Sequence, residues 1–146
     1  MASDSYDVLI LGGGNAGFGA TVPTRKAGMK VAMIEERDLG GTCPNRGGTP
    51  KKVLVAACHA LHEISQAHVH RISASKPKLD WGALIDREKE MIGGIPESLA
   101  ETLEERGVDL FRDSARFVGQ NAVKVGNRTI EAKHIVIATG SPAASA

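Results

Sequence analysis

Three glycines after the first apolar run have the spacing of a dinucleotide-binding motif. Gly12, Gly14 and Gly17 fit the pattern G-x-G-x-x-G. In this pattern the first glycine allows a tight turn, the second lets a pyrophosphate approach the backbone, and the third lets helix and strand pack closely. Asn15 and Ala16 would open a helix whose free N–H groups and positive dipole end suit phosphates. Taken alone the motif is weak evidence, because ordinary strand-to-helix turns are also rich in glycine.

An acidic residue further along the chain strengthens this interpretation. Glu35 directly follows a second apolar run, Lys30–Ile34, at the place where an acidic side chain would bind the adenosine ribose hydroxyls. The two features together predict dinucleotide binding. The acidic side chain argues against a 2′-phosphate, but the motif does not separate FAD from NAD.

A cysteine lies in the glycine- and proline-rich loop that comes next. Cys43 has Arg46 close by in sequence, and this cation could make the thiol more reactive or could simply be a surface charge. The chain has two cysteines, which do not make a disulfide framework. The second, Cys58, lies in the middle of an expected helix, where we expect it to pack in the core.

Composition and length exclude several classes of function. The chain has 146 residues, an apolar content of 42% and a net charge of +1, which fit one ordinary domain without a general attraction to nucleic acid. Aromatic residues make up 3%, too few for base-stacking platforms. No apolar run is long enough to cross a membrane, and the start of the chain lacks a basic signal region, so we expect a cytoplasmic protein. His59 and His62 stand one helical turn apart without further ligands nearby, so we expect no metal site.

Apolar periodicity predicts an α/β fold that would position these residues. We expect a parallel sheet of Val8–Leu11, Lys30–Ile34 and His134–Ala138, with a small antiparallel β-unit alongside. Thr49 and Asp80 would cap the second and third helices. The other expected elements are helices over Ala16–Ala27, Pro50–His70 and Trp81–Gly107 with an interruption at Gly93–Pro96, strands over Val108–Phe111 and Ala115–Val118, and a hairpin of Ala122–Val125 and Arg128–Ala132.

In this order the motifs resemble those of the pyridine nucleotide-disulfide oxidoreductases. These are FAD-dependent enzymes that include glutathione reductase, dihydrolipoamide dehydrogenase and mercuric reductase. The resemblance covers essentially the whole chain and is most specific at Gly40–Cys43, with Pro50 and Lys52 after it and Ala138–Gly140 near the end. It implies NAD(P)H-dependent oxidoreduction through FAD, with residues 1–146 as a Rossmann-like FAD-binding domain.

The resemblance also gives individual residues a role in holding the cofactor. It implies that the glycine turn flanks the FAD pyrophosphate and that Glu35 holds the AMP ribose. Lys52 would lie near the reactive edge of the flavin, where a cation stabilises the anionic reduced ring. The other implied contacts are Gly41, Thr42 and Cys43 beside the flavin, a backbone group at Ala115 against the adenine, and Ala138, Thr139 and Gly140 closing over the cofactor.

The chain departs from the family pattern at one thiol. Family members carry two redox cysteines spaced C-x-x-x-x-C, whereas here the second position is Gly48. In the family that second cysteine takes electrons from the flavin, and the cysteine at the Cys43 position attacks the substrate disulfide. A disulfide needs two sulfurs about 2 Å apart, and Cys58 lies too far along the helix, at roughly 1.5 Å per residue, to stand in. We therefore expect no disulfide reductase activity.

The resemblance further implies domains for which the chain has no sequence. The family needs an NAD(P)H-binding domain and a dimerisation domain, so we expect a fragment of a larger flavoprotein that uses NAD(P)H only with additional domains. Its expected partners are those C-terminal domains or a second copy in a homodimer. Two alternatives stay open: a nucleotide-binding remnant or partner-binding module without chemistry, and a flavoenzyme in which Cys43 alone cycles through sulfenic acid.

Overall fold

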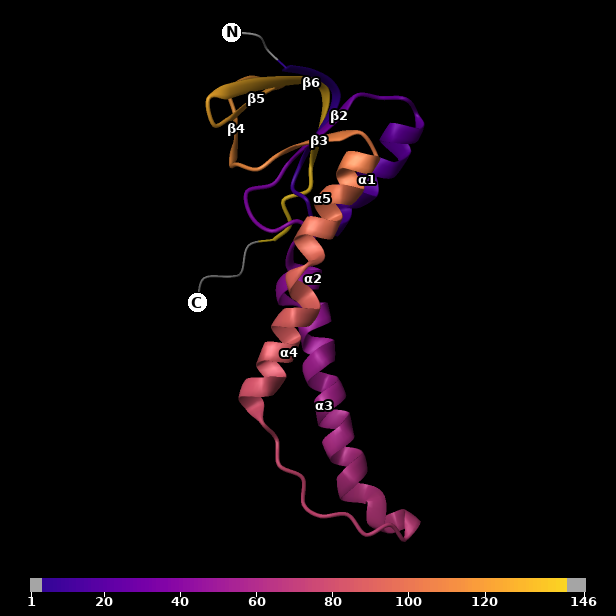
Figure 1. The fold of residues 1–146 in the computed structure, drawn as a ribbon. Helices are drawn as coiled ribbons and strands as arrows, with labels where there is room; N and C mark the ends of the chain where they lie inside the picture. Colours follow the sequence, from indigo (N-terminus) through magenta and orange to yellow (C-terminus); the bar gives the residue numbers. More distant parts are fainter. Residues whose placement is uncertain (1–3, 142–146) are drawn as a thin grey trace.

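The computed structural model describes residues 4–141, which form a six-stranded sheet with helices on one side and a projecting helical arm (Figure 1). The strand order is β3-β2-β1-β6-β5-β4. Strands β3, β2, β1 and β6 are parallel to one another, and β5 and β4 continue the sheet in antiparallel fashion. This confirms the expected combination. The strands are β1 (Asp4–Leu11), β2 (Val31–Ile34), β3 (Val108–Phe111), β4 (Ala115–Phe117), β5 (Ala122–Val125) and β6 (Arg128–Ile137).

The parallel strands carry buried apolar side chains on both faces, as is usual for a parallel sheet that other elements cover. On one face Ile10 and Met33 pack with Leu103 of helix α5 (Ile95–Glu105). On the other face Leu9 packs with Ile130 and with further residues of the antiparallel unit. The sheet therefore ends in a rigid edge, from which the connections at the carboxyl ends of β1, β2 and β6 emerge.

The arm consists of helices α3 (Gly48–Gln66) and α4 (Trp81–Gly93), and we call the rest of the described chain the body. Figure 1 shows α3 and α4 extending side by side away from the sheet. No residue of these two helices is buried, and Val55, Ile64, Trp81 and Met91 are exposed apolar side chains on them. The remaining helices are α1 (Asn15–Lys26), α2 (Thr42–Arg46) and the 3₁₀ helix η1 (Ala67–His70).

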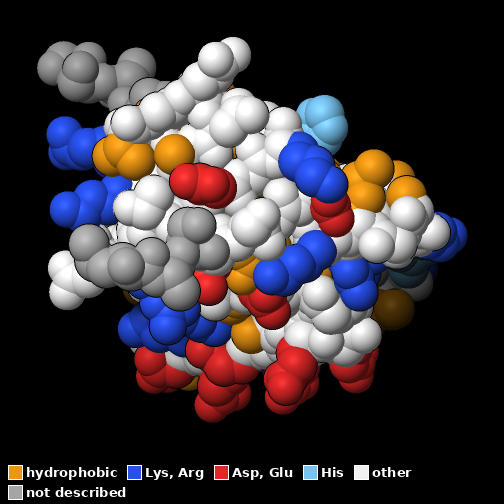
Figure 2. Space-filling view, turned by 90° about the horizontal axis from the view of Figure 1, so that it is seen from above, with side chains coloured by type: hydrophobic (Ala, Val, Ile, Leu, Met, Phe, Trp, Pro, Cys, Tyr) orange, Lys and Arg blue, Asp and Glu red, His pale blue; other side chains and the backbone are white. Residues whose placement is uncertain are grey.

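Charged and apolar side chains are mixed on the face of the molecule that is seen from above. Acidic side chains gather along one border of this face, lysine and arginine side chains lie along another border and across the middle, and apolar side chains are scattered (Figure 2). Such mixed charge is typical of a solvated surface. Within residues 4–141, no helix has the length and apolar character that crossing a membrane requires.

Two expected helix boundaries are confirmed by their local chemistry. The Asp80 carboxylate accepts a hydrogen bond from the Ala83 N–H at 3.0 Å and so caps the first turn of α4. Helix α4 ends at Gly93 and α5 begins at Ile95, so the expected interruption of the helix lies here. Pro96 is in the first turn of α5, where its missing N–H costs nothing.

Three expectations about the arm and the last strand are wrong. Thr49 is not a cap, because α3 already begins at Gly48 and continues almost directly from α2. Cys58 is exposed rather than packed in a core, because the arm projects from the body. Strand β6 is one continuous strand rather than two, since Lys133 stays in the sheet and its Nζ reaches the Asp7 Oδ1 at 2.7 Å.

Candidate functional site

Two of the three motif glycines are required by the backbone around them. Gly12 has φ +105°, and a Cβ at this position would lie 2.4 Å from the carbonyl oxygen of Ala138. A Cβ at Gly17 would lie 1.9 Å from the carbonyl oxygen of Gly12. Both distances are far inside van der Waals contact, so only glycine fits these two positions. The turn between β1 and α1 is therefore closed against the end of β6 and against its own helix.

Gly14 differs, because no protein atom crowds it. A Cβ here would meet its nearest neighbour, the Cα of Gly41, at 3.9 Å, which is an ordinary contact. Gly14 precedes α1, whose first turn has no side-chain cap and no acidic residue, and both Asn15 and Ala16 are exposed. The open space thus faces uncapped backbone N–H groups at a positive helix end, which is a suitable environment for an anion.

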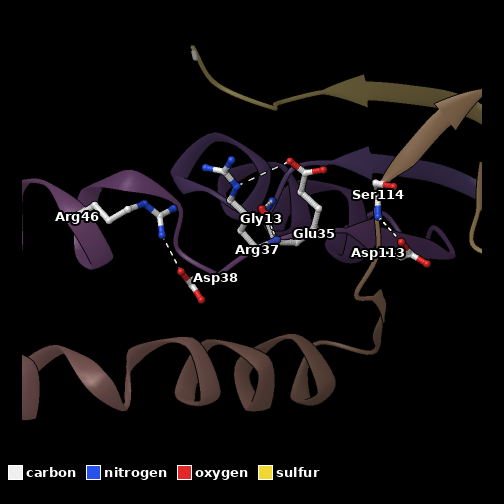
Figure 3. Close-up of polar contacts among 8 residues, drawn as sticks. Gly13, Glu35, Arg37, Asp38, Arg46, Asp113 and Ser114 are labelled. Carbon is white, nitrogen blue, oxygen red and sulfur yellow. Dashed lines mark hydrogen bonds and ion pairs between the residues drawn. The ribbon is translucent and has the colours of Figure 1, made fainter. Parts of the chain in front are cut away.

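The Glu35 carboxylate is fixed at this same turn. Its Oε2 accepts a hydrogen bond from the Gly13 N–H at 2.7 Å, and its Oε1 accepts one from the Arg37 N–H at 2.8 Å. Figure 3 shows the side chain pointing from the end of β2 toward these two groups (Figure 3). Hydrogen bonds to an ionised carboxylate are stronger than neutral ones. The expected acidic residue therefore lies next to the glycine turn, and each oxygen still has a lone pair that can accept another hydrogen bond.

The segment after β6 also reaches the turn. The Ala138 N–H donates to the Leu11 carbonyl at 2.8 Å, and a Cβ on Gly12 would lie 3.1 Å from the Cα of Thr139. Gly140 follows with φ +75° and is exposed. Residues far apart in the sequence are thus brought together at the carboxyl edge of the sheet.

The cysteine loop lies directly on the glycine turn. The Gly40 N–H donates to the Gly13 carbonyl at 2.8 Å, and a Cβ on Gly41 would lie 3.0 Å from the Cα of Gly14. Thr42 and Cys43 then open α2, a short helix that the sequence did not predict. Both residues are exposed, so the thiol is accessible at the border between the two loops.

Gly48 faces the Cys43 thiol. A Cβ at Gly48 would lie 3.5 Å from the Cys43 Sγ and 3.8 Å from the Cys43 carbonyl oxygen, both ordinary contacts. The site could therefore hold a second thiol without moving the backbone. Both cysteines of the chain are free.

Three further predicted residues do not take part in the contacts at the glycine turn. They are Arg46, Lys52 and Ala115. The Arg46 guanidinium forms an ion pair with the Asp38 carboxylate at 2.6 Å, with both side chains about half exposed, so a surface ion pair describes it. The Lys52 side chain is exposed in α3 and has no hydrogen-bond or ion-pair partner within residues 4–141. Ala115 begins β4, where it pairs with Val125.

A mainly apolar cavity of about 390 Å³ adjoins the thiol. Sequence reasoning missed it, because its walls come from separate elements that only the fold brings together. Within the described residues, no group of three or more His, Cys, Asp or Glu side chains could hold a metal ion. The cavity is lined by Asn15, Phe18, Gly40, Cys43, Pro44, Ile95 and Leu99.

Asn45 is a residue of the site that sequence reasoning missed. Its amide nitrogen donates to the carbonyls of Leu39 and Gly41 at 2.9 and 3.0 Å. Asparagine side chains commonly form hydrogen bonds with backbone groups three or four residues earlier, and this tendency could have identified Asn45.

The perturbed ionisable groups lie away from these two loops. Burial, together with a 2.8 Å hydrogen bond to Asp109, raises the pKa of Tyr6 well above its ordinary value. The hydrogen bond from Lys133, followed by the one from the backbone N–H of Lys30, lowers the pKa of Asp7, and the same carboxylate raises the pKa of Lys133. These groups support the sheet rather than the candidate site.

Comparisons with known proteins agree with this geometry. The chain is 30% identical over 142 residues to a dihydrolipoyl dehydrogenase of Chlamydia muridarum, an alignment that covers 95% of this chain and 30% of that protein. It is 35% identical over 148 residues to a mercuric reductase of Streptomyces lividans, with coverage of 97% and 31%. It is 32% identical over 146 residues to a mitochondrial dihydrolipoyl dehydrogenase of Arabidopsis thaliana, with coverage of 95% and 29%.

The chain thus spans about 30% of the length of these relatives, while the alignments cover nearly all of it. Residues 6–146 also match the model of one family, described as pyridine nucleotide-disulphide oxidoreductase. Together with the glycine turn, the acidic residue at the end of β2 and the cysteine loop, the match confirms the resemblance seen in the sequence. The chain belongs to the FAD-dependent pyridine nucleotide-disulfide oxidoreductases.

Proposed function

We propose that this chain is the FAD-binding domain of a flavin oxidoreductase and that it lacks the thiol relay for disulfide reduction. The observation that carries the first part is the contrast among the motif glycines. Gly12 and Gly17 have no room for a side chain, whereas Gly14 has room that the protein leaves open beside an uncapped helix end. An open approach to backbone N–H groups, with the Glu35 carboxylate next to it, suits a pyrophosphate and its adjoining ribose.

The residues around this space would bind and orient the cofactor. Gly14, Asn15 and Ala16 would offer backbone N–H groups to the pyrophosphate, and Glu35 would accept hydrogen bonds from the ribose. FAD supplies two-electron chemistry when it is bound. The remaining proposed contacts are Gly41, Thr42, Cys43 and Lys52 at the flavin, Ala115 at the adenine, and Ala138, Thr139 and Gly140 over the cofactor.

The second part of the proposal follows from Cys43 and Gly48. The Cys43 thiol is exposed beside an apolar cavity, which suits attack on a disulfide with an uncharged chain. Position 48, which faces this thiol, has no sulfur. Electrons from a reduced flavin would then have no dithiol through which to reach the substrate. We expect no turnover of a disulfide substrate, even if an NAD(P)H-binding domain is supplied.

The experiment that tests the first part is the absorption spectrum of the purified chain, before and after addition of FAD and removal of the excess. We expect a yellow protein whose flavin bands bleach with dithionite. A colourless protein that retains no added FAD would contradict the proposal. For the second part, steady reduction of a disulfide by the chain joined to an NAD(P)H-binding domain and a dimerisation domain would contradict the expected block at Gly48.

A second candidate function is favoured by the same glycine, together with the exposed arm. A chain without the relay thiol could bind nucleotide and serve only as a partner-binding module. The exposed apolar side chains of α3 and α4 support a partner, either C-terminal domains or a second copy. Sedimentation of the chain over a range of concentrations separates a self-associating protein from a monomer.

A further inference from the structure

Asn45 joins two carbonyls of a segment that has no regular secondary structure. The segment runs from the end of β2 to α2 and includes Gly40 at φ +94° and Gly41 at φ +66°. Leu39 lies outside every helix and strand, while Gly41 is the N-cap of α2, whose carbonyl accepts the first bond of that helix. The Asn45 Nδ2 binds both carbonyls, since it lies 2.9 Å from the Leu39 oxygen and 3.0 Å from the Gly41 oxygen.

The chemistry of the amide fixes the orientation of this side chain. A primary amide nitrogen has two hydrogens and can therefore donate to both carbonyls at once, whereas its oxygen can donate to neither. Aspartate at this position would turn an acceptor toward two acceptors. Serine could donate only once, and leucine could not donate at all. The site thus distinguishes side chains by the number of hydrogens that they can donate.

The bonded segment is also the one that touches the glycine turn. Gly40 donates to the Gly13 carbonyl at 2.8 Å, and Gly13 in turn donates to the Glu35 carboxylate at 2.7 Å. Asn45 itself lies in α2, two residues after Cys43. A continuous chain of hydrogen bonds therefore runs from Glu35 through both loops to the short helix that carries the thiol.

We propose that Asn45 is a positioning residue, whose amide clamps the cysteine loop onto the glycine turn and so holds Thr42 and Cys43 at the edge of the proposed FAD site. Helix α2 has five residues and no side-chain cap at its start. A helix this short is marginal without tertiary contacts. The two Asn45 bonds tie α2 to the residues on either side of Gly40, and Gly40 makes the contact with the glycine turn through its bond to the Gly13 carbonyl. The FAD part of this inference rests on the proposed function, while the clamp itself does not.

The test is a donor series at position 45 in the Cys58→Ser chain. Wild type, Asn45→Ser and Asn45→Leu offer two, one and no donors. We expect amide exchange at Gly40 and Gly41 to accelerate by about tenfold in Asn45→Leu, with Asn45→Ser between it and wild type. We expect the FAD dissociation constant to rise in the same order, by about tenfold in Asn45→Leu.

Matched controls come from Asn127, which is exposed in the turn between β5 and β6. Asn127→Ser and Asn127→Leu should change neither the exchange at Gly40 and Gly41 nor the affinity for FAD. Graded loss at position 45 but not at 127, with partial rescue by serine, supports positioning. Unchanged exchange in Asn45→Leu, or equal effects at both positions, overturns it.

The two readouts separate the failure of this inference from the failure of the proposed function. If wild type binds no FAD, the proposed function fails, and the exchange series still decides on the clamp. If Asn45→Leu does not fold, Asn45→Ser carries the test, and wild-type exchange in that variant overturns the clamp. If FAD binds equally to all variants while exchange changes, the positioning role toward the cofactor is overturned.

Discussion

The glycine turn, residues 12–17, and the cysteine loop, residues 40–48, both depend on glycine, but for different reasons. In the turn, a Cβ on Gly17 would lie 1.9 Å from a backbone oxygen, so the backbone itself excludes every other residue. In the loop, a Cβ on Gly48 would make only ordinary contacts, the nearest at 3.5 Å from the Cys43 Sγ. One glycine is required by the fold, and the other is not.

Under the proposed function, this difference separates the part of the site that would bind the cofactor from the part that would react. The packing of β1, α1 and β6 preserves Gly12 and Gly17, because a Cβ at either position would collide with backbone atoms. Position 48 is under no such constraint, so its thiol can be absent without harm to the fold. In the proposed function, the chain thus keeps the architecture of a cofactor site and lacks the second thiol that disulfide reduction needs.

The largest effect should come from a methyl group on the required glycine. Gly17→Ala places a carbon inside the radius of the Gly12 oxygen, so we expect the free energy of unfolding to fall by about 3 kcal/mol and FAD binding to be lost. Urea unfolding and the flavin spectrum measure both. Gly19→Ala is the matched control in the same helix, where nothing lies within 4 Å, and it should stabilise the chain by about 0.5 kcal/mol. Equal tolerance of the two changes would remove the basis of the comparison.

A thiol at the unconstrained glycine should restore the missing pair. In the Cys58→Ser chain, Gly48→Cys should form a disulfide with Cys43, because the Cβ position and the existing sulfur are 3.5 Å apart. Intact mass should show the loss of two hydrogens after oxidation, and the disulfide should stabilise the chain by about 2 kcal/mol. Gly93→Cys, in open space on the arm, should keep a free thiol. If the thiol introduced at position 48 never pairs, the geometry of the loop described above is wrong.

A smaller effect should follow from neutralising the acid at the turn. Glu35→Gln keeps the shape of the side chain. Its NH₂ group, however, would face one of the two N–H groups, of Gly13 and Arg37, that now donate to the carboxylate. We expect a loss of about 1 kcal/mol in unfolding free energy and a roughly tenfold weaker affinity for FAD. The neighbouring Glu36→Gln, which touches only Arg37 at 4.0 Å on the surface, is the control and should change neither quantity.

The smallest effect should come from an exposed ion pair outside both loops. Lys133→Met removes the group that lowers the pKa of Asp7, and Asp7 in turn raises the pKa of Lys133. The stabilisation from Asp7 is present above its unfolded pKa of about 4 and is lost as the pH falls through the lowered value. That from Lys133 is present below its unfolded pKa of about 10 and is lost as the pH rises through the raised value. Thermal unfolding should show a small difference at neutral pH that narrows under acid, and FAD binding should not change at either pH.

The sequence predicted the parts of the fold that local patterns determine. Apolar runs located β1, β2 and β3, Asp80 located the start of α4, and the glycines before Pro96 located the break in the arm. Each of these depends on a residue's own preference or on neighbours a few positions away. The position of Glu35 beside the glycine turn also followed, because its place at the end of a strand fixes it.

What the sequence did not predict depends on contacts between distant residues. Helix α2 lies among glycines and a proline that favour a loop, and the segment before it is held by the bond from the Gly40 N–H to the Gly13 carbonyl of the distant glycine turn. The exposure of Cys58 depends on how far the arm projects, which helical periodicity does not report. The cavity beside Cys43 exists only because α1, α2 and α5 meet there.

The pairing of β1 with β6 has a consequence for how the protein is made. Asp4 pairs with Ile130 and Leu11 with Ile137, so β1 leaves the ribosome long before β6, which lies beside it in the sheet. The glycine turn shares this delay, since the backbone of Gly12 lies against Ala138. The carboxyl edge of the sheet therefore stays incomplete until β6 has been made, and such long-range closure is slow. Completion of the glycine turn and completion of the sheet are then a single event.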